Sequence, residues 1–267
     1  MAQPIGLIAT KGIELLTFST PNGFRIAILL EELKAAYNTP YTVQSIDIFA
    51  GVQKEPWYLA LNPNGRIPVL IDHDQGDHVV TEGPAIMSYL TRMYDAEIRF
   101  GFVEPLEVSG MEQWMSWLHA GLGPNQTQAN FFYRFCPARH AFPTFRFVSE
   151  TERHYSVLDA HLQDREYVAG SGRGRYSIVD IALFPFVEAI GVAGIELERY
   201  PNVLKWWERV SQREAVKKGM MVPSGKPFHF GYEVLRKMKS EDIEGWEERE
   251  GPLEKALVAA RREYGQA

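Results

Sequence analysis

Apolar and polar positions follow two different rhythms over residues 13–95. Short apolar runs, such as IELLTF at 13–18, have the length and composition of buried strands, whereas Ile26, Leu29 and Leu33 recur at the spacing of a helix face. The pattern predicts strands over 13–18, 41–48, 66–73 and 77–82 and helices over 23–37, 54–62 and 83–94. This order, βαβαββα, is typical of a small α/β domain with helices packed on a mixed sheet.

Helical periodicity alone continues after residue 104. It predicts helices over 106–122, 145–163, 177–193 and 201–216, so that residues 101–225 form an all-α domain. The last segment, 226–267, is rich in Glu, Lys and Arg with scattered aromatic residues, and we expect one or two surface helices there. The expected fold is therefore α/β followed by all-α, with domains at 1–96 and 101–225 and a C-terminal helical extension at 226–267.

Composition and charge limit which binding partners and which cellular compartment we expect. With 45% hydrophobic residues, 23% charged residues and a net charge of −6, we expect a globular protein that binds neither nucleic acid nor a membrane. No apolar run reaches the ~20 residues of a membrane span, and the N-terminus does not resemble a secretory signal. Cys136, the single cysteine, excludes an intramolecular disulfide and indicates a structural thiol in a reducing, cytoplasmic compartment.

Most catalytic signatures are missing from the sequence. It contains no GxSxG motif, no GxxxxGK[ST] phosphate loop and no HExxH zinc motif. His154 and His161 are seven residues apart on one helix face, without a matching set of carboxylate or thiol partners. We therefore expect no metal site.

The turn between the first strand and the first helix is unusually polar. The segment Ser19-Thr20-Pro21-Asn22-Gly23 places hydroxyls and a carboxamide before a helix expected to begin near Gly23. Neutral donors at a helix N-terminus stabilise an anion. The alternative is that Asn22 caps the helix, because Asn is a favoured N-cap and Gly tolerates any φ.

Two further segments have the features of a binding site. Ile67-Pro68 directly precedes a predicted strand, where a cis peptide would turn the backbone and leave polar groups open to a ligand. Glu82 and Gly83 stand at a predicted helix start. The Glu82 carboxylate and nearby N–H groups would clamp the two ends of an amino-acid head group.

Together these residues resemble the thioredoxin-like domain of glutathione transferases, and the all-α remainder resembles the second domain of that family. Ser177-Ile178-Val179-Asp180 matches the family's capping box. The Thr20-Pro21-Asn22-Gly23 turn looks most like the bacterial nu class and the related fungal class that includes the yeast nitrogen-catabolite regulator. The resemblance covers residues 13–225. It implies a glutathione-binding domain, an all-α domain with an electrophile pocket, and glutathione as co-substrate.

The resemblance gives the polar turn a role in activating a thiol. A free cysteine-type thiol has a pKa of about 8.5. Lowering the pKa by about two units requires roughly 2.7 kcal/mol of preferential stabilisation of the thiolate. In the nu-like enzymes that this turn resembles, the residues matching Thr20 and Asn22 are assigned this role.

The remaining glutathione contacts follow from the same resemblance. Ile67, beside a cis Pro68, would pair with the cysteinyl unit, Glu82 would hold the γ-glutamyl ammonium, and Gln53 and Arg66 would reach the glycine end. Without a ligand, Arg66 is a solvated loop cation, Pro68 a strand-entry proline and Glu82 a first-turn acid. The family has Ser or Thr where this chain has Gly83, which removes a hydrogen bond worth about 1.5–3 kcal/mol to a charged group and leaves only the Gly83 N–H.

A second substrate is expected between the domains, against the first helix of the all-α domain. The predicted lining combines an apolar stripe with two polar side chains, and it comprises Met111, Trp114, Met115, Leu118, His119 and Gln126. The alternative is that the stripe belongs to the core.

The resemblance implies a glutathione-dependent transferase or disulfide-bond reductase. A homodimer would act on a small electrophile or disulfide. Two alternatives stay open. One is a glutathione-dependent lyase or isomerase of small-molecule metabolism, and the other is a non-catalytic ligand-binding or regulatory protein on the same fold.

Overall fold

The first part of the chain builds a four-stranded sheet. The computed structural model describes residues 6–265. The strands lie in the order β2-β1-β3-β4, with β1 and β2 parallel and the other pairs antiparallel. The elements follow as β1 (Ile13–Thr17), α1 (Pro21–Tyr37), β2 (Tyr41–Ser45), α2 (Pro56–Leu61), β3 (Val69–Asp72), β4 (His78–Thr81) and α3 (Gly83–Tyr94), with short 3₁₀ turns η1 (Val52–Lys54) and η2 (His73–Gln75). The predicted βαβαββα order is confirmed.

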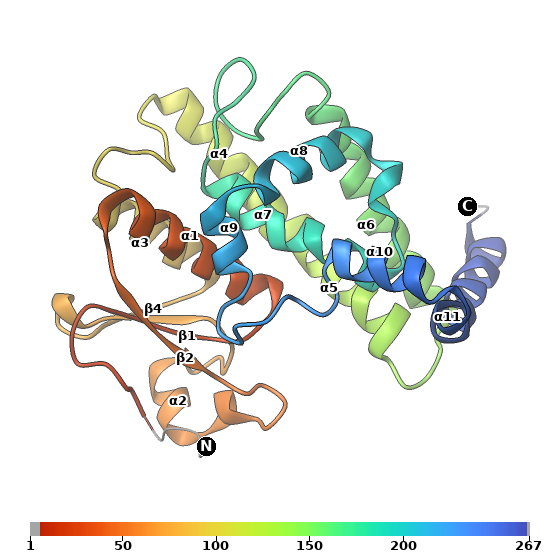
Figure 1. The fold of residues 1–267 in the computed structure, drawn as a ribbon, viewed down its shortest axis with the longest axis horizontal. Coiled ribbons are helices and arrows are strands. Elements are labelled where there is room, and N and C mark those ends of the chain that lie inside the picture. Colours follow the sequence, from red (N-terminus) through yellow and green to blue (C-terminus); the bar gives the residue numbers. More distant parts are fainter. Residues whose placement is uncertain (1–5, 266–267) are drawn as a thin grey trace. The chain divides into compact units, whose positions relative to one another are not determined.

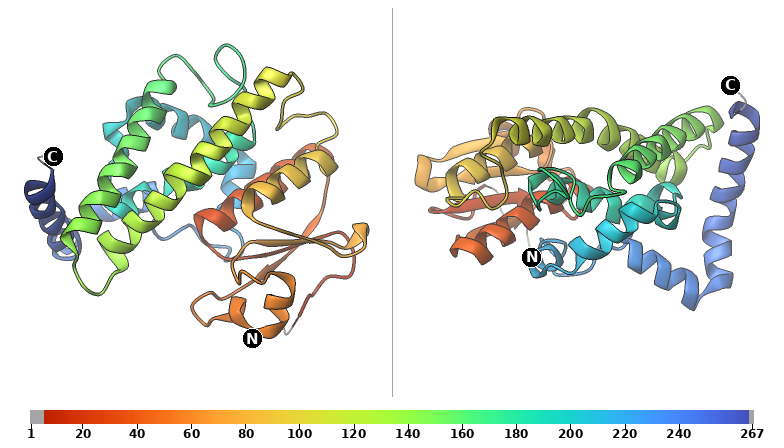
Figure 2. Two further views of the ribbon diagram at one scale, coloured as in Figure 1. Left: turned by 180° about the vertical axis from the view of Figure 1, so that it is seen from behind. Right: turned by 90° about the horizontal axis from the view of Figure 1, so that it is seen from above.

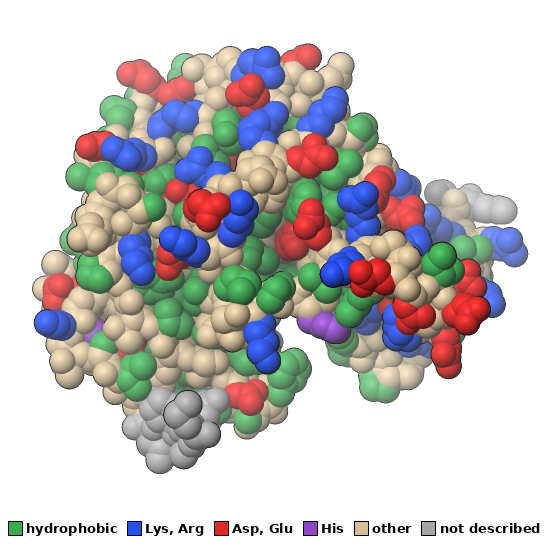
Figure 3. Space-filling view, in the orientation of Figure 1, with side chains coloured by type: hydrophobic (Ala, Val, Ile, Leu, Met, Phe, Trp, Pro, Cys, Tyr) green, Lys and Arg blue, Asp and Glu red, His purple; other side chains and the backbone are tan. Residues whose placement is uncertain are grey.

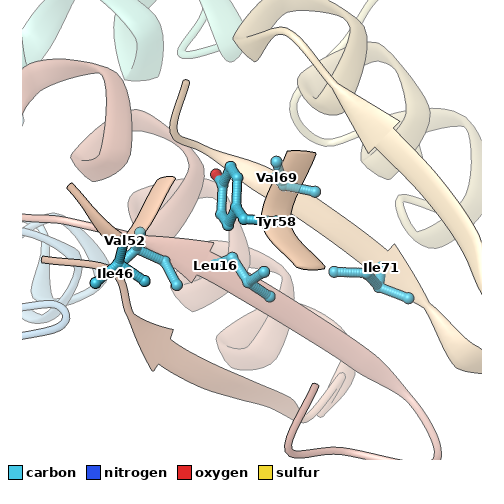
Figure 4. Packing of buried hydrophobic residues seen from close by; sticks show 6 residues of the cluster. All are labelled: Leu16, Ile46, Val52, Tyr58, Val69 and Ile71. Carbon is cyan, nitrogen blue, oxygen red and sulfur yellow. The ribbon is translucent and has the colours of Figure 1, made fainter. Parts of the chain in front are cut away.

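Helices cover both faces of this sheet. Figure 1 shows α1 and α3 on one face and α2 on the other. Every residue of the central strand β1 is buried, as expected for a strand with two covered faces. On the α2 side, a hydrophobic cluster (Figure 4) unites side chains from the sheet, the residue after β2, η1 and α2, namely Leu16, Ile46, Val52, Tyr58, Val69 and Ile71.

Two later segments belong to the same compact unit. Contacts group Tyr176–Pro185 and Val210–Pro227 with the described residues up to Val108. Helix α9 (Glu214–Gly219) packs on α1 so closely that a Cβ at Gly219 would lie 2.5 Å from the Cα of Ile28. Arg213 also forms two hydrogen bonds with the buried Glu32, at 2.7 and 2.9 Å. Glycine at 219 therefore allows α1 and α9 to meet backbone to backbone.

The predicted capping box opens helix α7 (Ile178–Glu188). The Asp180 carboxylate accepts the Ser177 N–H at 3.0 Å, and the Ser177 hydroxyl accepts the Val179 N–H at 3.3 Å. Reciprocal bonds of this kind satisfy the donors that a helix start leaves open. This prediction is confirmed.

In the described residues of the other compact unit, helices joined by loops are the regular secondary structure. This unit comprises Ser109–Arg175, Phe186–Arg209 and the described residues from Phe228 onward. Its helices are α4 (Pro105–Trp117, whose first turn precedes the unit), α5 (Gly123–Asn130), α6 (Ala141–His161), α8 (Pro201–Ser211, whose last residues follow the unit), α10 (Tyr232–Glu241) and α11 (Ile243–Tyr264), with π-helical turns η3 (Leu118–Leu122) and η4 (Phe131–Phe135) and 3₁₀ turns η5 (Ile190–Ala193) and η6 (Leu197–Arg199). α5 and α6 lie side by side (Figure 2). The expectation of α/β followed by all-α is confirmed.

The charged C-terminal segment forms helices α10 and α11. Acidic and basic side chains intersperse over the part of these helices that Figure 3 shows. Arg134 anchors α11 by two hydrogen bonds to the buried Glu250, at 2.6 and 2.9 Å. Tyr264 stacks on Phe145 of α6 with ring centroids 6.2 Å apart. Among residues 6–265, no helix combines the length and apolar character needed to cross a membrane.

Candidate functional site

The N-terminus of α1 carries the predicted thiol-activating residues. Thr20 is the N-cap: its hydroxyl oxygen accepts the Gly23 N–H at 3.2 Å, and its carbonyl accepts the Phe24 N–H at 2.8 Å. The helix begins at Pro21 and not near Gly23, because proline is favoured at the first helical position and requires the cap to precede it. The expected helix start and the alternative of Asn22 as the cap are both wrong.

This geometry leaves donors available at the start of α1. Because the Thr20 hydroxyl oxygen accepts the capping bond, its own hydrogen is free to donate to another acceptor. Asn22 lies in the first turn, where N–H groups lack intrahelical acceptors, and its side chain is partly exposed. The Asn22 Oδ1 accepts a hydrogen bond from the Arg25 guanidinium. The arrangement suits an anion bound beside Thr20 and Asn22.

The segment before β3 has the predicted cis peptide, between Ile67 and Pro68. Within the described residues, the backbone N–H and carbonyl of Ile67 have no hydrogen-bond partner. The preceding carbonyl, that of Arg66, accepts from the Tyr58 hydroxyl and from the Asn62 amide, each at 2.9 Å. The loop is thus fixed on one side, while the Ile67 backbone is open for pairing with an extended ligand.

Glu82 adopts an uncommon backbone conformation at the N-cap of α3, with φ of 65°. Residues other than glycine pay about 1–3 kcal/mol for such sparsely populated conformations, which cluster at functional sites. The exposed Glu82 carboxylate accepts a hydrogen bond from the Asn64 side-chain amide at 3.3 Å. The backbone conformation of Glu82 is therefore a second reason, beside the helix start, to place a ligand contact here.

Gly83 contacts a side chain that the sequence analysis missed. A Cβ at position 83 would lie 2.7 Å from Cζ, Nε and Nη2 of Arg25. Arg25 is 5% exposed. Burial lowers the pKa of its guanidinium to about 10, while the nearby Glu82 charge acts to raise it. Arg25 therefore brings a buried positive charge to both Asn22 and the 82–83 segment.

The structure gives less support to the two residues predicted to contact the glycine end of the ligand. Arg66 is exposed, so its side chain is available to a ligand or to water. Gln53 donates its amide to the Ile48 carbonyl at 3.1 Å, and its buried Oε1 has no hydrogen-bond partner within the described residues. These two assignments stay predictions.

The predicted electrophile-pocket residues lie in the helical unit and differ in exposure. Met111, Trp114 and His119 are partly exposed, Met115 is 8% exposed and Leu118 is fully buried. The Trp114 ring packs against Trp117 and His161, with centroids 5.0 and 4.2 Å away. The exposed part of the stripe is the part that remains a candidate pocket wall.

Gln126 has a structural role within this unit. It is 1% exposed, donates to the Phe186 carbonyl at 2.7 Å and accepts from the Tyr155 hydroxyl at 2.8 Å. Both ends of the amide are thus occupied by protein groups. Gln126 and Leu118 fit the core alternative better than a pocket lining.

Within 6–265, no group of three or more His, Cys, Asp or Glu side chains is arranged to hold a metal ion. Cys136 is a buried free thiol.

Comparison with known proteins identifies two family regions. Residues 20–93 match the model described as "Glutathione S-transferase, N-terminal domain", and residues 147–214 match "Glutathione S-transferase, C-terminal domain". All of the residues discussed between Thr20 and Gly83 fall in the first region.

Individual proteins agree with these family models. The chain is 32% identical over 213 residues to the disulfide-bond oxidoreductase YfcG of Escherichia coli, covering 78% of this chain and 94% of that protein. A solved glutathione transferase homologue from Lodderomyces elongisporus, with two glutathione molecules per subunit, has a TM-score of 0.74 and 32% identity over 80% of this chain and 99% of its own. URE2P8 of Phanerochaete chrysosporium, solved with oxidised glutathione, has a TM-score of 0.73 and 27% identity, covering 80% and 95%.

Proposed function

Since this chain belongs to the glutathione transferase family, we propose that Asn22 and Thr20 activate the thiol of bound glutathione. The chain is a glutathione-dependent enzyme of the transferase or disulfide-bond reductase kind. The proposal concerns which residues carry the chemistry and which reaction they favour.

One observation carries the proposal: neutral donors gather at the start of α1 with a buried cation behind them. The Thr20 hydroxyl and the Asn22 amide flank the first turn, and the Arg25 guanidinium contacts Asn22. All of these groups lower the free energy of an anion relative to its neutral acid. About 2.7 kcal/mol of such stabilisation lowers a thiol pKa from about 8.5 to about 6.5.

We assign the remaining glutathione contacts to residues of the same unit. Ile67, beside cis Pro68, pairs with the cysteinyl backbone, and Glu82 holds the γ-glutamyl ammonium. The Gly83 N–H donates to the γ-glutamyl carboxylate, and Gln53 and Arg66 serve the glycine end. The open Ile67 backbone and the strained Glu82 cap support this assignment.

Disulfide reduction is the reaction that we favour. The glutathione thiolate attacks one sulfur of a disulfide, the S–S bond breaks, and the other sulfur leaves as a thiolate that takes a proton. A second glutathione resolves the resulting mixed disulfide and yields oxidised glutathione. No protein thiol takes part, in keeping with the burial of Cys136. The name of YfcG and the oxidised glutathione in the URE2P8 structure support this choice.

The compartment, the oligomeric state and the roles of the domains are proposed from the sequence. The enzyme acts in the cytoplasm as a homodimer, with residues 1–96 binding glutathione, 101–225 supplying the electrophile or disulfide pocket, and 226–267 as an extension. Met111, Trp114, Met115 and His119 are the pocket residues that retain exposed surface.

Calorimetric titration with reduced and oxidised glutathione tests the function. We expect binding of both forms, acidification of the bound thiol, and turnover of a small mixed disulfide. Binding without acidification or turnover would favour a regulatory protein. Acidification without disulfide turnover would favour conjugation, lyase or isomerase chemistry. Absence of binding by either form would overturn the proposal.

A further inference from the structure

The Arg25 guanidinium occupies the space that a side chain at position 83 would need. A Cβ at position 83 would approach three guanidinium atoms of Arg25 to 2.7 Å, closer than carbon atoms pack. The left-handed conformation at this corner belongs to Glu82, not to Gly83. Glycine at 83 is therefore explained by the space that Arg25 occupies and not by backbone freedom.

Arg25 in turn determines which way the Asn22 amide faces. The two residues are three apart on α1, and the guanidinium donates to Asn22 Oδ1. A guanidinium has donors only, so it selects the carbonyl end of the amide. The N–H₂ end is then directed away from Arg25. In the opposite orientation the amide oxygen would face the bound anion and repel it.

The charge of Arg25 reinforces this orientation. The side chain is 5% exposed, so little water separates its charge from its neighbours. Its pKa, although lowered by burial to about 10, keeps the guanidinium protonated at neutral pH, and the nearby Glu82 favours the protonated form. The Asn22 carbonyl thus faces a permanent cation across the pH range in which a glutathione thiol ionises.

We propose that Arg25 is a positioning residue, which holds the Asn22 N–H₂ group toward the glutathione thiol, and that Gly83 is the glycine that admits it. The inference rests on the proposed function, because it assigns the cause of thiol activation within that same site. Glycine at position 83 thus lacks the hydroxyl of the family's Ser or Thr but leaves room for the Arg25 guanidinium.

Four variants test this inference. Arg25→Met keeps volume and removes every donor, Arg25→Lys keeps a donor-only cation, Gly83→Ser displaces the guanidinium without altering α1, and the fourth combines Arg25→Met with Gly83→Ser. For each, the thiol pKa of bound glutathione is measured from thiolate ultraviolet absorbance against pH, together with kcat and KM for a small mixed disulfide. Calorimetry of the unaltered protein comes first.

We expect Arg25→Met to raise the thiol pKa by about one unit and to lower kcat roughly tenfold at neutral pH, the lower end for losing a hydrogen bond to a charged group. Arg25→Lys should restore most of both. Gly83→Ser should behave like Arg25→Met, and the double variant should be no worse than Arg25→Met alone, because the clash disappears with the guanidinium.

The possible failures are distinguishable. An unaltered protein that does not bind glutathione overturns the proposed function, and the inference with it. An unaltered protein that acidifies the thiol while Arg25→Met does so equally overturns the inference alone. An effect of Arg25→Met on KM without a change in thiol pKa also overturns it, since Arg25 would then bind the γ-glutamyl end directly. If Arg25→Met does not fold, Arg25→Lys and Gly83→Ser decide the matter by the same pKa readout.

Discussion

Asn22 is the side chain whose removal should affect chemistry most and structure least. It is partly exposed, and the helix cap is Thr20, so Asn22→Ala leaves the start of α1 intact. We expect the bound thiol pKa to return toward about 8.5 and kcat to fall roughly 10²-fold, as when one donor to a developing anion is lost.

The matched control for this variant is Asn22→Asp, which keeps the shape and the contact with Arg25 but replaces donors by a negative charge. It should raise the thiol pKa further than Asn22→Ala does. An Asn22→Ala variant with an unchanged thiol pKa would contradict thiol activation by this residue.

Glu82 should affect binding and not acidification. Its exposed carboxylate is offered to the γ-glutamyl ammonium, so Glu82→Gln removes a charged partner at a distance from the thiol. We expect the dissociation constant of reduced glutathione, measured by calorimetry, to rise roughly 10- to 100-fold. Glu97→Gln, which removes an exposed carboxylate from a surface pair with Arg99, should leave it unchanged. Equal effects of the two variants would remove the specific role of Glu82.

The sequence could identify Glu82 but not Arg25. Glu82 stands next to Gly83 and Pro84 at an obvious helix start, a local signal. Arg25 lies among buried apolar residues of α1, where a cation reads as an interruption of the pattern. The role of Arg25 depends on its closeness to Gly83, which is 58 positions later in the sequence, and only the tertiary structure shows that closeness.

At the scale of elements, prediction succeeded where local chemistry marks both ends. Helix 83–94 begins and ends where expected, because Glu82 and Pro84 stand at its start and Asp95 closes it. The strand predicted over 66–73 is shorter, Val69–Asp72, since Pro68 cannot donate to a sheet ladder. The π-helical turns η3 and η4 were not predicted, because a period of 3.6 residues does not distinguish them from α-helix.

Helix α11 is held by the apolar side chains Leu253, Leu257 and Ala260 and by ion pairs, of which Arg134–Glu250 is the most buried. The side chains of Glu250 and Arg134 are only 9% and 12% exposed, so this pair is largely shielded from water. Glu250→Ala leaves the Arg134 charge without its carboxylate, at a cost of about 3 kcal/mol. We expect amide hydrogen exchange across α11 to accelerate about 10²-fold.

Two control variants distinguish the effect of the ion pair from an effect of general helix propensity. Glu248→Ala, an exposed acid on the same helix, should not change the exchange. Replacing both partners, with Arg134→Met and Glu250→Leu, should be less disruptive than Glu250→Ala, since no buried charge is then left. Unaltered exchange in Glu250→Ala would show that packing alone holds α11.

For the whole molecule, the structural classes of the two parts could be predicted from the sequence, but the segments that belong to each part could not. Periodicity separates strands from helices, yet it does not show that Tyr176–Pro185 and Val210–Pro227 join the sheet-containing unit. Val210–Pro227 joins it through the close approach of Gly219 to Ile28 and the pairing of Arg213 with Glu32. Tyr176–Pro185 is linked to it by the Ile178 N–H, which donates to the Phe100 carbonyl at 2.9 Å. The domain limits of 1–96, 101–225 and 226–267 stay a prediction.

The stability of the helical unit should depend on pH through Glu188. Burial raises the pKa of this carboxyl from 4.5 to about 7, although the Trp207 indole donates to it at 2.7 Å and a backbone bond from Tyr232 acts to lower it. The folded state therefore holds the proton more tightly than the unfolded state. Its contribution to stability is fully present below about 4.5 and is lost as the pH rises through about 7, a change of about 3 kcal/mol.

Hydrogen exchange of α8 amides at several pH values measures this dependence in the unit itself. After correction for intrinsic exchange rates, protection in the unaltered protein should fall between pH ~5 and ~8. Glu188→Gln keeps the shape but cannot titrate, so its protection should be nearly constant over that range and should exceed the unaltered protein's at the alkaline end. Glu247→Gln, an exposed acid on α11, should follow the unaltered protein. The same pH dependence in Glu188→Gln would show that another group is responsible.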